Sequence, residues 1–514
     1  MKRIVSFALA MLMLAGTLVL ASCGGTTTPA VTTDGGISVT DPIVTTEPPV
    51  TEPVDPCPIE RMSYDGYEFL VLEGTFSLVT SIYDFSYKED NATVLDDAVF
   101  KRNTAVCDRL DILIDSKEVV CRSTTGSAEG YGVMIREKTA GDCNYDAVIL
   151  PAYDQSMITY NDANHDMNSV DTIDFKNEWW DQMAVESLEI KGMQFFTTGD
   201  FSIDNFNSTI VIAFNKKLAK EKNIPDLYSL VNEGKWTLDK WKEYSLLVYE
   251  DLNGDEKFTD EDRYGSLVWD DAIYAIVNGA GERCCVVDEN GDMVLTLGTE
   301  GVVSAFKDYT DFVVESNAVL RYQHTFDASG KKTFNASSPL EFTMFPQDKG
   351  LFLFTWLGVT AKFRDMETDY GILPVFKYTE DQDRYYCTVA PYNSRFLSMP
   401  YHQEDAERTG VILETIGYYS REYVRPAYYD KMLYGSIIRD EESRPMLDLI
   451  YANRVFDIGY YYQPANINKN LLYVFRDSSS AWASRYKSME RPATLQLKKI
   501  NQFFTGLADK AAEN

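Results

Sequence analysis

Apolar runs separated by helix-like segments dominate the chain after residue 60. The run YDAVILPAYD at 145–154 is continuous and bounded by loop residues, which is typical of a strand buried on both faces of a parallel sheet. The stretch 67–76, YEFLVLEGTF, has the same character, and residues 95–112 between them repeat apolar positions at helical spacing. The expected buried side of that helix comprises Val99, Thr104, Val106 and Leu110. Alternation of strands and helices predicts an α/β fold.

The middle of the chain continues the alternation. Residues 208–231 predict a strand, the start of a helix and a break at Pro225. Thr237 is a suitable N-cap for a helix that follows, because Asp239 and Lys240 then occupy its first turn. About 450 residues lie beyond residue 60, which is too long for one ordinary core, so two or more lobes are expected.

The first 60 residues have a different composition. Lys2 and Arg3 precede an apolar run that ends in Leu20-Ala21-Ser22-Cys23, and this end resembles the lipobox of bacterial lipoproteins. The resemblance implies a lipoprotein signal peptide at 1–22, a diacylated (palmitate-bearing) Cys23 and anchoring by lipid alone at the extracytoplasmic face of the cell membrane. An ordinary signal peptide or a short transmembrane anchor is the alternative interpretation. Residues 23–60 are rich in Thr and Pro and predict a disordered tether.

Charge and cysteine spacing exclude two classes of function. Removing residues 1–22, which carry two positive and no negative side chains, takes the formal net charge from -31 to about -33, so binding to nucleic acid is not expected. Seven cysteines remain after Cys23, and none of them forms a CxxC pair, so a zinc site is not expected. One or two disulfides are compatible with an extracellular location, with no pairing indicated.

Several segments, in this order and spacing, resemble an extracellular solute-binding protein, the lipoprotein receptor of a bacterial ABC importer. The resemblance is closest to the sugar-binding, maltose-binding-like branch. The segments are DAVILPAYD, EWWDQMAVESLEIKGMQFFTTGDFS, STIVIAFNKKL, KWTLDKWKEY, FTMFPQDKGLFLFTW, DYGILPVFKY and ERTGVILETI. The resemblance implies a two-lobed α/β fold of the type II periplasmic-binding-protein-like class, with a ligand cleft between the lobes. The expected lobes are an N-lobe of residues 61–205 and 373–425 and a C-lobe of residues 206–372 and 426–514.

Candidate ligand-binding residues follow from the rule that ligands lie beyond the carboxyl ends of the strands in such sheets. Aromatic rings can cover the apolar faces of a sugar, while carboxylates and hydroxyls bind its hydroxyl groups. The residues selected in this way are Glu73, Thr75, Tyr153, Asp154, Asp200, Trp269 and Trp356, and Trp180, which precedes a helix-like segment, is a further candidate. The alternative for each aromatic residue is packing in a core.

The resemblance implies a function without catalysis. The protein is expected to capture a solute, a sugar or oligosaccharide, as a monomer, and to deliver it to the permease of an ABC transporter. A surface adhesin or a sensor module with the same fold is the alternative. A glycoside-active enzyme is a third hypothesis. The acidic residues are so abundant that the sequence identifies no particular catalytic pair, and the three histidines are scattered and form no HExxH motif.

The stretch 251–262 has nearly the spacing of an EF-hand calcium loop. The expected metal ligands are Asp251, Asn253, Asp255, Lys257 through its carbonyl, Thr259 and Asp262. The sixth position is Glu256, where the motif has glycine for a sharp turn. The alternative is a solvated acidic turn without metal. No cofactor is required, and a calcium ion here is expected to be structural. Asn290-Gly291, in a similar acidic stretch, instead predicts a β-hairpin turn.

Overall fold

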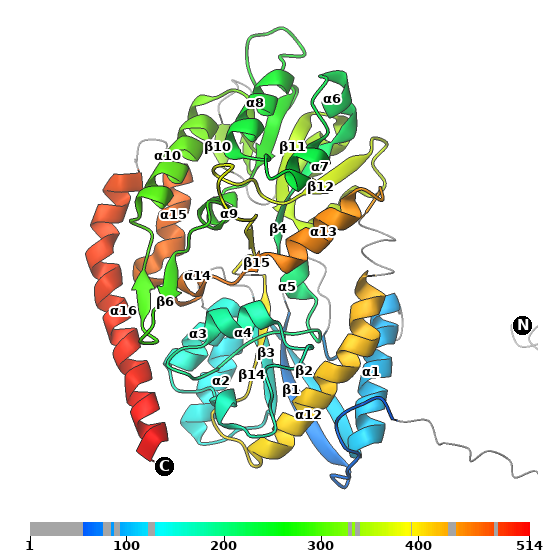
Figure 1. The fold of residues 1–514 in the computed structure, drawn as a ribbon, viewed down its shortest axis with the longest axis vertical. Coiled ribbons are helices and arrows are strands. Elements are labelled where there is room, and N and C mark those ends of the chain that lie inside the picture. The colour runs from blue at the N-terminus through cyan, green and yellow to red at the C-terminus, as the bar shows by residue number, and fades with distance from the viewer. Residues whose placement is uncertain are drawn as a thin grey trace, which may run out of the picture. The chain divides into compact units, whose positions relative to one another are not determined.

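The computed structural model (Figure 1) describes most of the chain after residue 54. The described residues are 55–75, 84–86, 93–121, 129–326, 332–334, 340–391, 393–429, 438–476 and 482–513. Residues 57–514 form one compact unit, distinct from residues 1–56. The predicted signal peptide, Cys23 and most of the predicted tether therefore lie outside the described residues. Within the described part, no helix is both long and apolar enough to cross a membrane.

The folded unit begins at Cys57 rather than at residue 61. The guanidinium of Arg109 donates hydrogen bonds to the carbonyl oxygens of Ile59 (2.7 Å) and Cys57 (3.2 Å). Backbone amides of Met62 and Tyr64 then pair with the end of the helix that carries Arg109. These contacts hold residues 57–64 against the N-lobe, so residues 57–60 of the predicted tether pack on the folded unit.

The N-lobe is built on a four-stranded sheet of order β14-β3-β1-β2. Strand β1 is parallel to both β2 and β3, and β14 is antiparallel to β3. The strands are β1 (Tyr67–Thr75), β2 (Ile112–Val120), β3 (Ala147–Pro151) and β14 (Arg395–Ser398). The helices of this lobe are α1 (Val94–Leu110), α2 (Glu129–Ala140), α3 (Ala152–Tyr160), α4 (Gln182–Leu188) and α12 (Ala406–Tyr419).

Each face of this sheet has its own core, because successive side chains of a strand point to opposite faces. Phe69, Val71 and Ile149 pack with buried residues of α1 and α12. Leu72 and Val148 pack on the other face with Met134 of α2 and Ile158 of α3. Thr104 is exposed, which corrects its prediction as a buried residue of α1.

The C-lobe is built on a five-stranded sheet of order β12-β4-β11-β5-β8. Strand β4 is antiparallel to β11 and β12, whereas β11, β5 and β8 are parallel. The strands are β4 (Ile210–Asn215), β5 (Tyr264–Val268), β8 (Val319–Arg321), β11 (Gly350–Trp356) and β12 (Tyr370–Leu373). The helices are α6 (Lys216–Glu221), α7 (Leu227–Asn232), α8 (Leu238–Val248), α9 (Ala272–Gly279), α10 (Glu300–Glu315), α11 (Glu341–Met344) and α13 (Ser443–Ala452).

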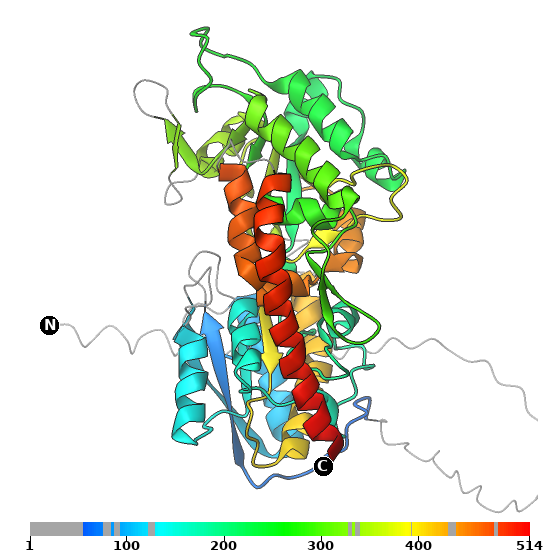
Figure 2. The same ribbon diagram turned by 90° about the vertical axis from the view of Figure 1, so that its left-hand side faces the viewer.

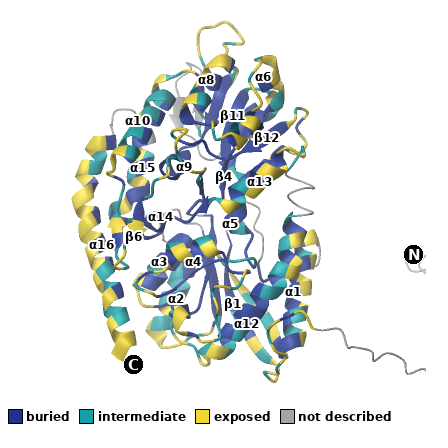
Figure 3. Ribbon diagram, viewed as in Figure 1, coloured by how far each residue is buried: buried dark blue, intermediate teal, exposed yellow. Residues whose placement is uncertain are grey.

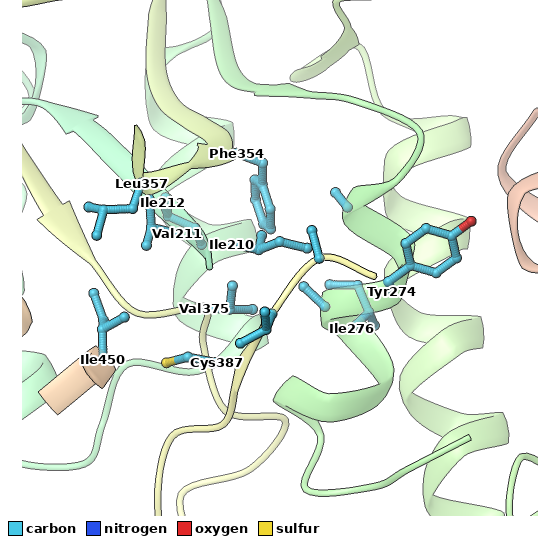
Figure 4. Packing of buried hydrophobic residues seen from close by; sticks show 14 of the residues in the cluster. Ile210, Val211, Ile212, Tyr274, Ile276, Phe354, Leu357, Val375, Cys387 and Ile450 are labelled. Atoms are coloured by element: carbon cyan, nitrogen blue, oxygen red, sulfur yellow. The ribbon is translucent and has the colours of Figure 1, made fainter. Parts of the chain in front are cut away.

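The strands of the C-lobe sheet are almost entirely buried (Figure 3), and Figure 4 shows Ile210, Ile212 and Phe354 packed beside Val375 in its core. A small hairpin, β6 (Cys285–Val287) and β7 (Met293–Leu295), turns at Gly291, whose φ is +73°. This hairpin confirms the predicted Asn290-Gly291 turn. The remaining short elements are β9 (His324–Phe326) and β10 (Lys332–Phe334).

The two sheets are joined by crossing segments that pair with each other. Helix α5 (Asp204–Asn207) leads into β4, and the amide of Ala390 donates to the carbonyl of Ser208 at 3.0 Å. Strand β13 (Cys387–Thr388) pairs with β15 (Arg454–Val455). Residues 373–388 remain with the C-lobe, because Lys377 exchanges backbone hydrogen bonds with Trp236 and Leu238. The chain therefore rejoins the N-lobe sheet at β14 rather than at residue 373.

The last part of the chain contacts both lobes. Helices α14 (Ile458–Tyr462), α15 (Ile467–Arg476) and α16 (Trp482–Glu513) follow β15, and Figures 1 and 2 both show α16 running alongside the two sheets. Trp482 packs on Phe306 of the C-lobe with ring centroids 4.9 Å apart. Near its other end, Phe503 packs on Tyr160 of the N-lobe at 5.2 Å. The predicted assignment of 426–514 to the C-lobe thus describes only part of this segment.

Candidate functional site at the facing edges of the two sheets

The sheet topology brings one edge of each sheet to the crossing segments. Strand β14 begins at Arg395, just after a crossing segment, and it is antiparallel to β3. The carboxyl ends of β3 and of its parallel neighbour β1 therefore lie at the same edge. In the C-lobe, β4 begins just after α5 and is antiparallel to β11, so the carboxyl ends of β11, β5 and β8 lie at the edge next to α5. These are the edges where the ligand rule places a site.

Three aromatic rings gather at the C-lobe edge. Trp269 follows β5, Trp356 ends β11 and Tyr322 follows β8. The ring centroid of Trp269 is 5.7 Å from that of Trp356, with the rings nearly perpendicular, and 6.3 Å from that of Tyr322, with the rings stacked. Trp269 is 3 % exposed and Trp356 is half-buried. The indole N–H of Trp269 is buried and has no hydrogen-bond partner in the described part of the chain.

Acidic side chains lie near one of these rings, Tyr322. Burial raises the pKa of Tyr322 well above its ordinary value, and the carboxylates of Glu341, Asp271 and Asp270 raise it further. Burial also raises the pKa of Glu341 to about 8. The side-chain oxygen of Gln323 accepts a hydrogen bond from the amide of Asp270 at 2.8 Å. The C-lobe edge therefore combines aromatic rings, two of them buried and Trp356 half-buried, with hydrogen-bond acceptors, and these residue types suit a ligand with apolar faces and hydroxyl groups.

Tyr153 and Asp154 lie at the start of α3, at the N-lobe edge. The Tyr153 hydroxyl accepts a hydrogen bond from the side-chain amide of Asn468. Burial raises the pKa of Tyr153, and the next cause is the carboxylate of Asp271 from the C-lobe, so the two edges are electrostatically coupled here. Asp154 is 1 % exposed, and its burial raises its pKa to about 7 although the Cys121 thiol donates to it.

Glu73 is placed at the predicted edge but is fully buried. Its carboxylate accepts hydrogen bonds from the amides of Asp84 (2.5 Å) and Ser86 (3.2 Å) and lies 3.4 Å from the guanidinium of Arg395. Arg395 also contacts Asp84 at 2.9 Å and Asp204 at 2.7 Å. Glu73 thus belongs to a buried ion network centred on Arg395, a residue that the sequence analysis did not select.

Thr75 ends β1 and is 8 % exposed. Its hydroxyl donates to the carbonyl of Val119 at 3.5 Å, and its own carbonyl accepts from the amide of Cys121 at 2.7 Å. Thr75 is therefore at the predicted edge, with its polar groups engaged by neighbouring β2.

The structure does not bring Trp180 or Asp200 to the aromatic cluster of the other lobe. The indole N–H groups of Trp179 and Trp180 each donate to Glu414 of α12 at 2.8 Å, inside the N-lobe core. Asp200, with a side chain 7 % exposed, forms ion pairs with Arg421 (3.2 Å) and Arg425. Both predicted residues have partners that account for their burial without a ligand.

The loop 251–262 folds around its own acidic side chains. The carboxylate of Asp251 accepts hydrogen bonds from the amides of Gly254 (2.7 Å) and Glu256 (2.8 Å), which lowers the pKa of Asp251. Glu256 has a φ of +62°, so it adopts the left-handed conformation for which the calcium motif has glycine. Asp262 is fully buried and accepts hydrogen bonds from the amides of Leu252 and Thr259.

The other expected metal ligands also contact the backbone of the loop. Asn253 accepts from the amide of Asp255 at 3.0 Å, and Asp255 accepts from the amide of Lys257 at 2.9 Å. No group of three or more His, Cys, Asp and Glu side chains within the described ranges is arranged to hold a metal ion. Calcium binding by this loop stays a prediction.

A hollow of about 910 Å³ lies at the opposite edge of the N-lobe sheet. Its lining includes Tyr67, Asp146 and Gln403. The Tyr67 hydroxyl donates to Asp146 at 2.5 Å, and Gln403 donates to the carbonyl of Asp146. Because these polar groups already satisfy one another, we place the site at the facing edges instead.

Comparisons with known proteins agree on the fold. No family model matches the chain, and no curated protein matches it by sequence. The lacto-N-biose complex of the galacto-N-biose-/lacto-N-biose I-binding protein of an ABC transporter from Bifidobacterium longum is similar, with 10 % identity, a TM-score of 0.56, and coverage of 85 % of this chain and 98 % of that chain. An ABC substrate-binding protein from Listeria monocytogenes in complex with cycloalternan has 12 % identity and a TM-score of 0.52, and covers 86 % of this chain and 100 % of that chain.

A third similar structure is a complex with a solute other than a free sugar. It is a protein from Mycobacterium tuberculosis in complex with glycerophosphocholine, with 12 % identity, a TM-score of 0.52, and coverage of 84 % of this chain and 98 % of that chain. At these identities the likeness shows the fold alone. The chain has the two-lobed α/β fold of extracellular solute-binding proteins, which confirms the predicted fold class.

Proposed function

We propose that this protein captures a carbohydrate between the facing edges of its two sheets and delivers it to an ABC importer. The observation that carries the proposal is the group of Trp269, Tyr322 and Trp356 at the carboxyl ends of three C-lobe strands, with acidic side chains near Tyr322. Sugars present apolar C–H faces flanked by hydroxyl groups, which rings and carboxylates respectively bind. Solved proteins with this fold bind cycloalternan and lacto-N-biose, and this supports the choice of ligand class.

The proposal includes the location and partners expected from the sequence. Lipid on Cys23 anchors the protein to the outer face of the cell membrane, and the segment before Cys57 is the tether. A monomer then presents the loaded site to the transporter permease. The acidic net charge of -31 supports the absence of nucleic acid from this set of partners. The proposal assigns the chain a binding role without catalysis.

A thermal-shift screen of the purified protein against a carbohydrate library tests this function. A ligand that binds only the folded state increases the free energy of unfolding by mass action, by about 2.7 kcal/mol when the free ligand concentration is a hundred times Kd. The melting temperature rises as a result. We expect at least one neutral sugar to raise the melting temperature in a concentration-dependent way. A library-wide lack of stabilisation, with peptides or other polar solutes active instead, would contradict the carbohydrate assignment.

A further inference from the structure

Asn393 lies in the segment that crosses from the C-lobe to the N-lobe sheet. The amide of Ala390 donates to Ser208 beside α5, and the carbonyl of Ser394 accepts from the amide of Ala152 (3.2 Å) at the end of β3. These two contacts hold Asn393 between the other crossing segment and the N-lobe edge where the site is placed. The residue is therefore positioned by backbone contacts on both sides and not by its own side chain.

The side chain of Asn393 is 5 % exposed, yet neither its oxygen nor its nitrogen has a hydrogen-bond partner. Among the described asparagines it is the one with both amide atoms buried in this way. Burying a polar group without a hydrogen-bond partner destabilises the folded state, so such a group in a folded protein requires an explanation. A partner that is not part of the protein supplies one.

Asn205 of α5 lies next to the same segment. Its nitrogen donates to the carbonyl of Arg395 at 2.8 Å and to the hydroxyl of Thr198, which fixes the orientation of the amide. Its oxygen is buried and has no partner in the described part of the chain. Asn393 precedes Arg395 by two residues and Asn205 donates to the carbonyl of Arg395, so one unpaired amide nitrogen and two unpaired amide oxygens lie near Arg395 on two different crossing segments.

Arg395, near these amides, is surrounded by acidic side chains. Arg395 contacts Glu73 of β1, Asp84, and Asp204 of α5. Arg102 of α1 reaches the carbonyl of Asp84. Burial raises the pKa of Asp84 to about 8, so its carboxyl is protonated at neutral pH. The guanidinium of Arg395 is therefore already paired with acidic side chains of the protein and does not provide a free positive charge for an anionic ligand.

We propose that Asn393, together with the oxygen of Asn205, binds a pair of neighbouring hydroxyl groups on a neutral sugar. One hydroxyl donates to an amide oxygen while the next accepts from the Asn393 nitrogen, so the buried amide atoms gain the partners they lack. This inference rests on the proposed carbohydrate-binding function and assigns its polar subsite to the crossing segments. A ligand held there contacts the segments that connect the two lobes.

The test compares Asn393→Leu and Asn393→Ala with a matched control, Asn215→Ala. Asn215 is also fully buried, but its amide is paired with Asp348 (2.7 Å) and with the amide of Leu218 (2.9 Å), at the edge of the C-lobe sheet away from α5. The full chain is titrated calorimetrically with maltotriose and lacto-N-biose as neutral probes, and with glucosamine and glycerophosphocholine as charged probes. Melting temperatures are measured without ligand.

We expect a neutral probe to bind the unmodified protein more tightly than the charged probes. Both Asn393 variants should lose on the order of ten-fold or more in affinity, because a ten-fold change corresponds to one modest hydrogen-bond contribution. Asn393→Leu should melt no lower than the unmodified protein, since an apolar group of similar size replaces an unpaired amide. Asn215→Ala should melt lower with unchanged affinity.

Three results overturn the inference. Unchanged affinity in both Asn393 variants would remove Asn393 from the site while leaving carbohydrate binding intact. A large loss of melting temperature in Asn393→Leu would assign the amide a structural role. Failure of every neutral probe to bind the unmodified protein would reject the subsite. If no sugar of the carbohydrate library binds in the same assay either, the proposed carbohydrate-binding function is rejected as well.

Discussion

The carboxyl group of Asp84 makes the stability of the fold dependent on pH. Asp84 is 1 % exposed, and burial raises its pKa to about 8 despite the guanidinium of Arg395 at 2.9 Å. Its pKa in the unfolded chain is about 3.9. The folded state therefore retains a proton between about pH 4 and pH 8 that the unfolded state has lost. The stabilising contribution is fully present below about pH 4 and is lost as the pH rises through about 8.

The magnitude follows from this difference in bound protons. Each pH unit within the window removes at most about 1.4 kcal/mol, so a rise from pH 5 to pH 7 removes up to about 3 kcal/mol through Asp84. Asp84→Asn keeps the size of the side chain and abolishes its titration. Between pH 5 and pH 7 the free energy of unfolding should therefore decline less in this variant than in the unmodified protein. The two declines should differ by up to about 3 kcal/mol.

Urea unfolding at several pH values between 5 and 8 measures this effect as the difference between the unmodified protein and Asp84→Asn. Asp154, with a pKa of about 7, and Glu341, with a pKa of about 8, titrate in the same range. Both are present in the two proteins, so their contributions cancel in the difference. A difference that stays constant from pH 5 to pH 8 would refute the claim that the buried carboxyl group is protonated.

Three further predictions concern the anchor, the loop and the aromatic cluster. Cys23→Ala should move the protein from the membrane to the soluble fraction with an unchanged melting temperature, and continued membrane retention would contradict the lipid anchor. Millimolar calcium should raise the melting temperature and leave sugar affinity nearly constant. The double variant Asp251→Ala with Asp255→Ala should abolish that increase in melting temperature. No effect of calcium on the melting temperature would favour the metal-free acidic turn. Trp356→Ala or Trp269→Ala should weaken sugar binding by about 1–3 kcal/mol in calorimetry, whereas unchanged affinity with lower stability would assign both rings to the core.

Local patterns predicted most of the elements. The apolar run 145–154 forms fully buried β3, and the helical spacing at 95–112 forms α1. Helix α1 ends at Leu110 because Asp111 adopts a left-handed conformation, with φ of +50°, before β2 begins. The hydroxyl of Thr237 accepts from the amide of Lys240 at 3.4 Å, as expected for an N-cap. These features depend on residues close together in the sequence.

The site was less predictable because its contacts join distant residues. Trp180 and Glu414 are 234 positions apart, and Glu73 and Arg395 are 322 positions apart. Their partners could not be chosen from a sequence with 79 acidic side chains. The ligand rule selects strand ends, so it selected Trp269 and Trp356, which lie at the ends of β5 and β11, but it does not select crossing segments. Asn393 carries no motif, and its unpaired amide is visible only in the folded chain.

Hydrogen–deuterium exchange with a sugar found in the carbohydrate screen tests most directly whether ligand binds between the facing edges. We expect slower exchange in peptides from both lobes, at residues 268–273 and 353–358 of the C-lobe and at residues 390–396, which include the start of β14. Peptides lining the hollow at the other end of the N-lobe sheet, around residues 143–146, should be unchanged. Protection restricted to one lobe, or centred on residues 143–146, would contradict the account.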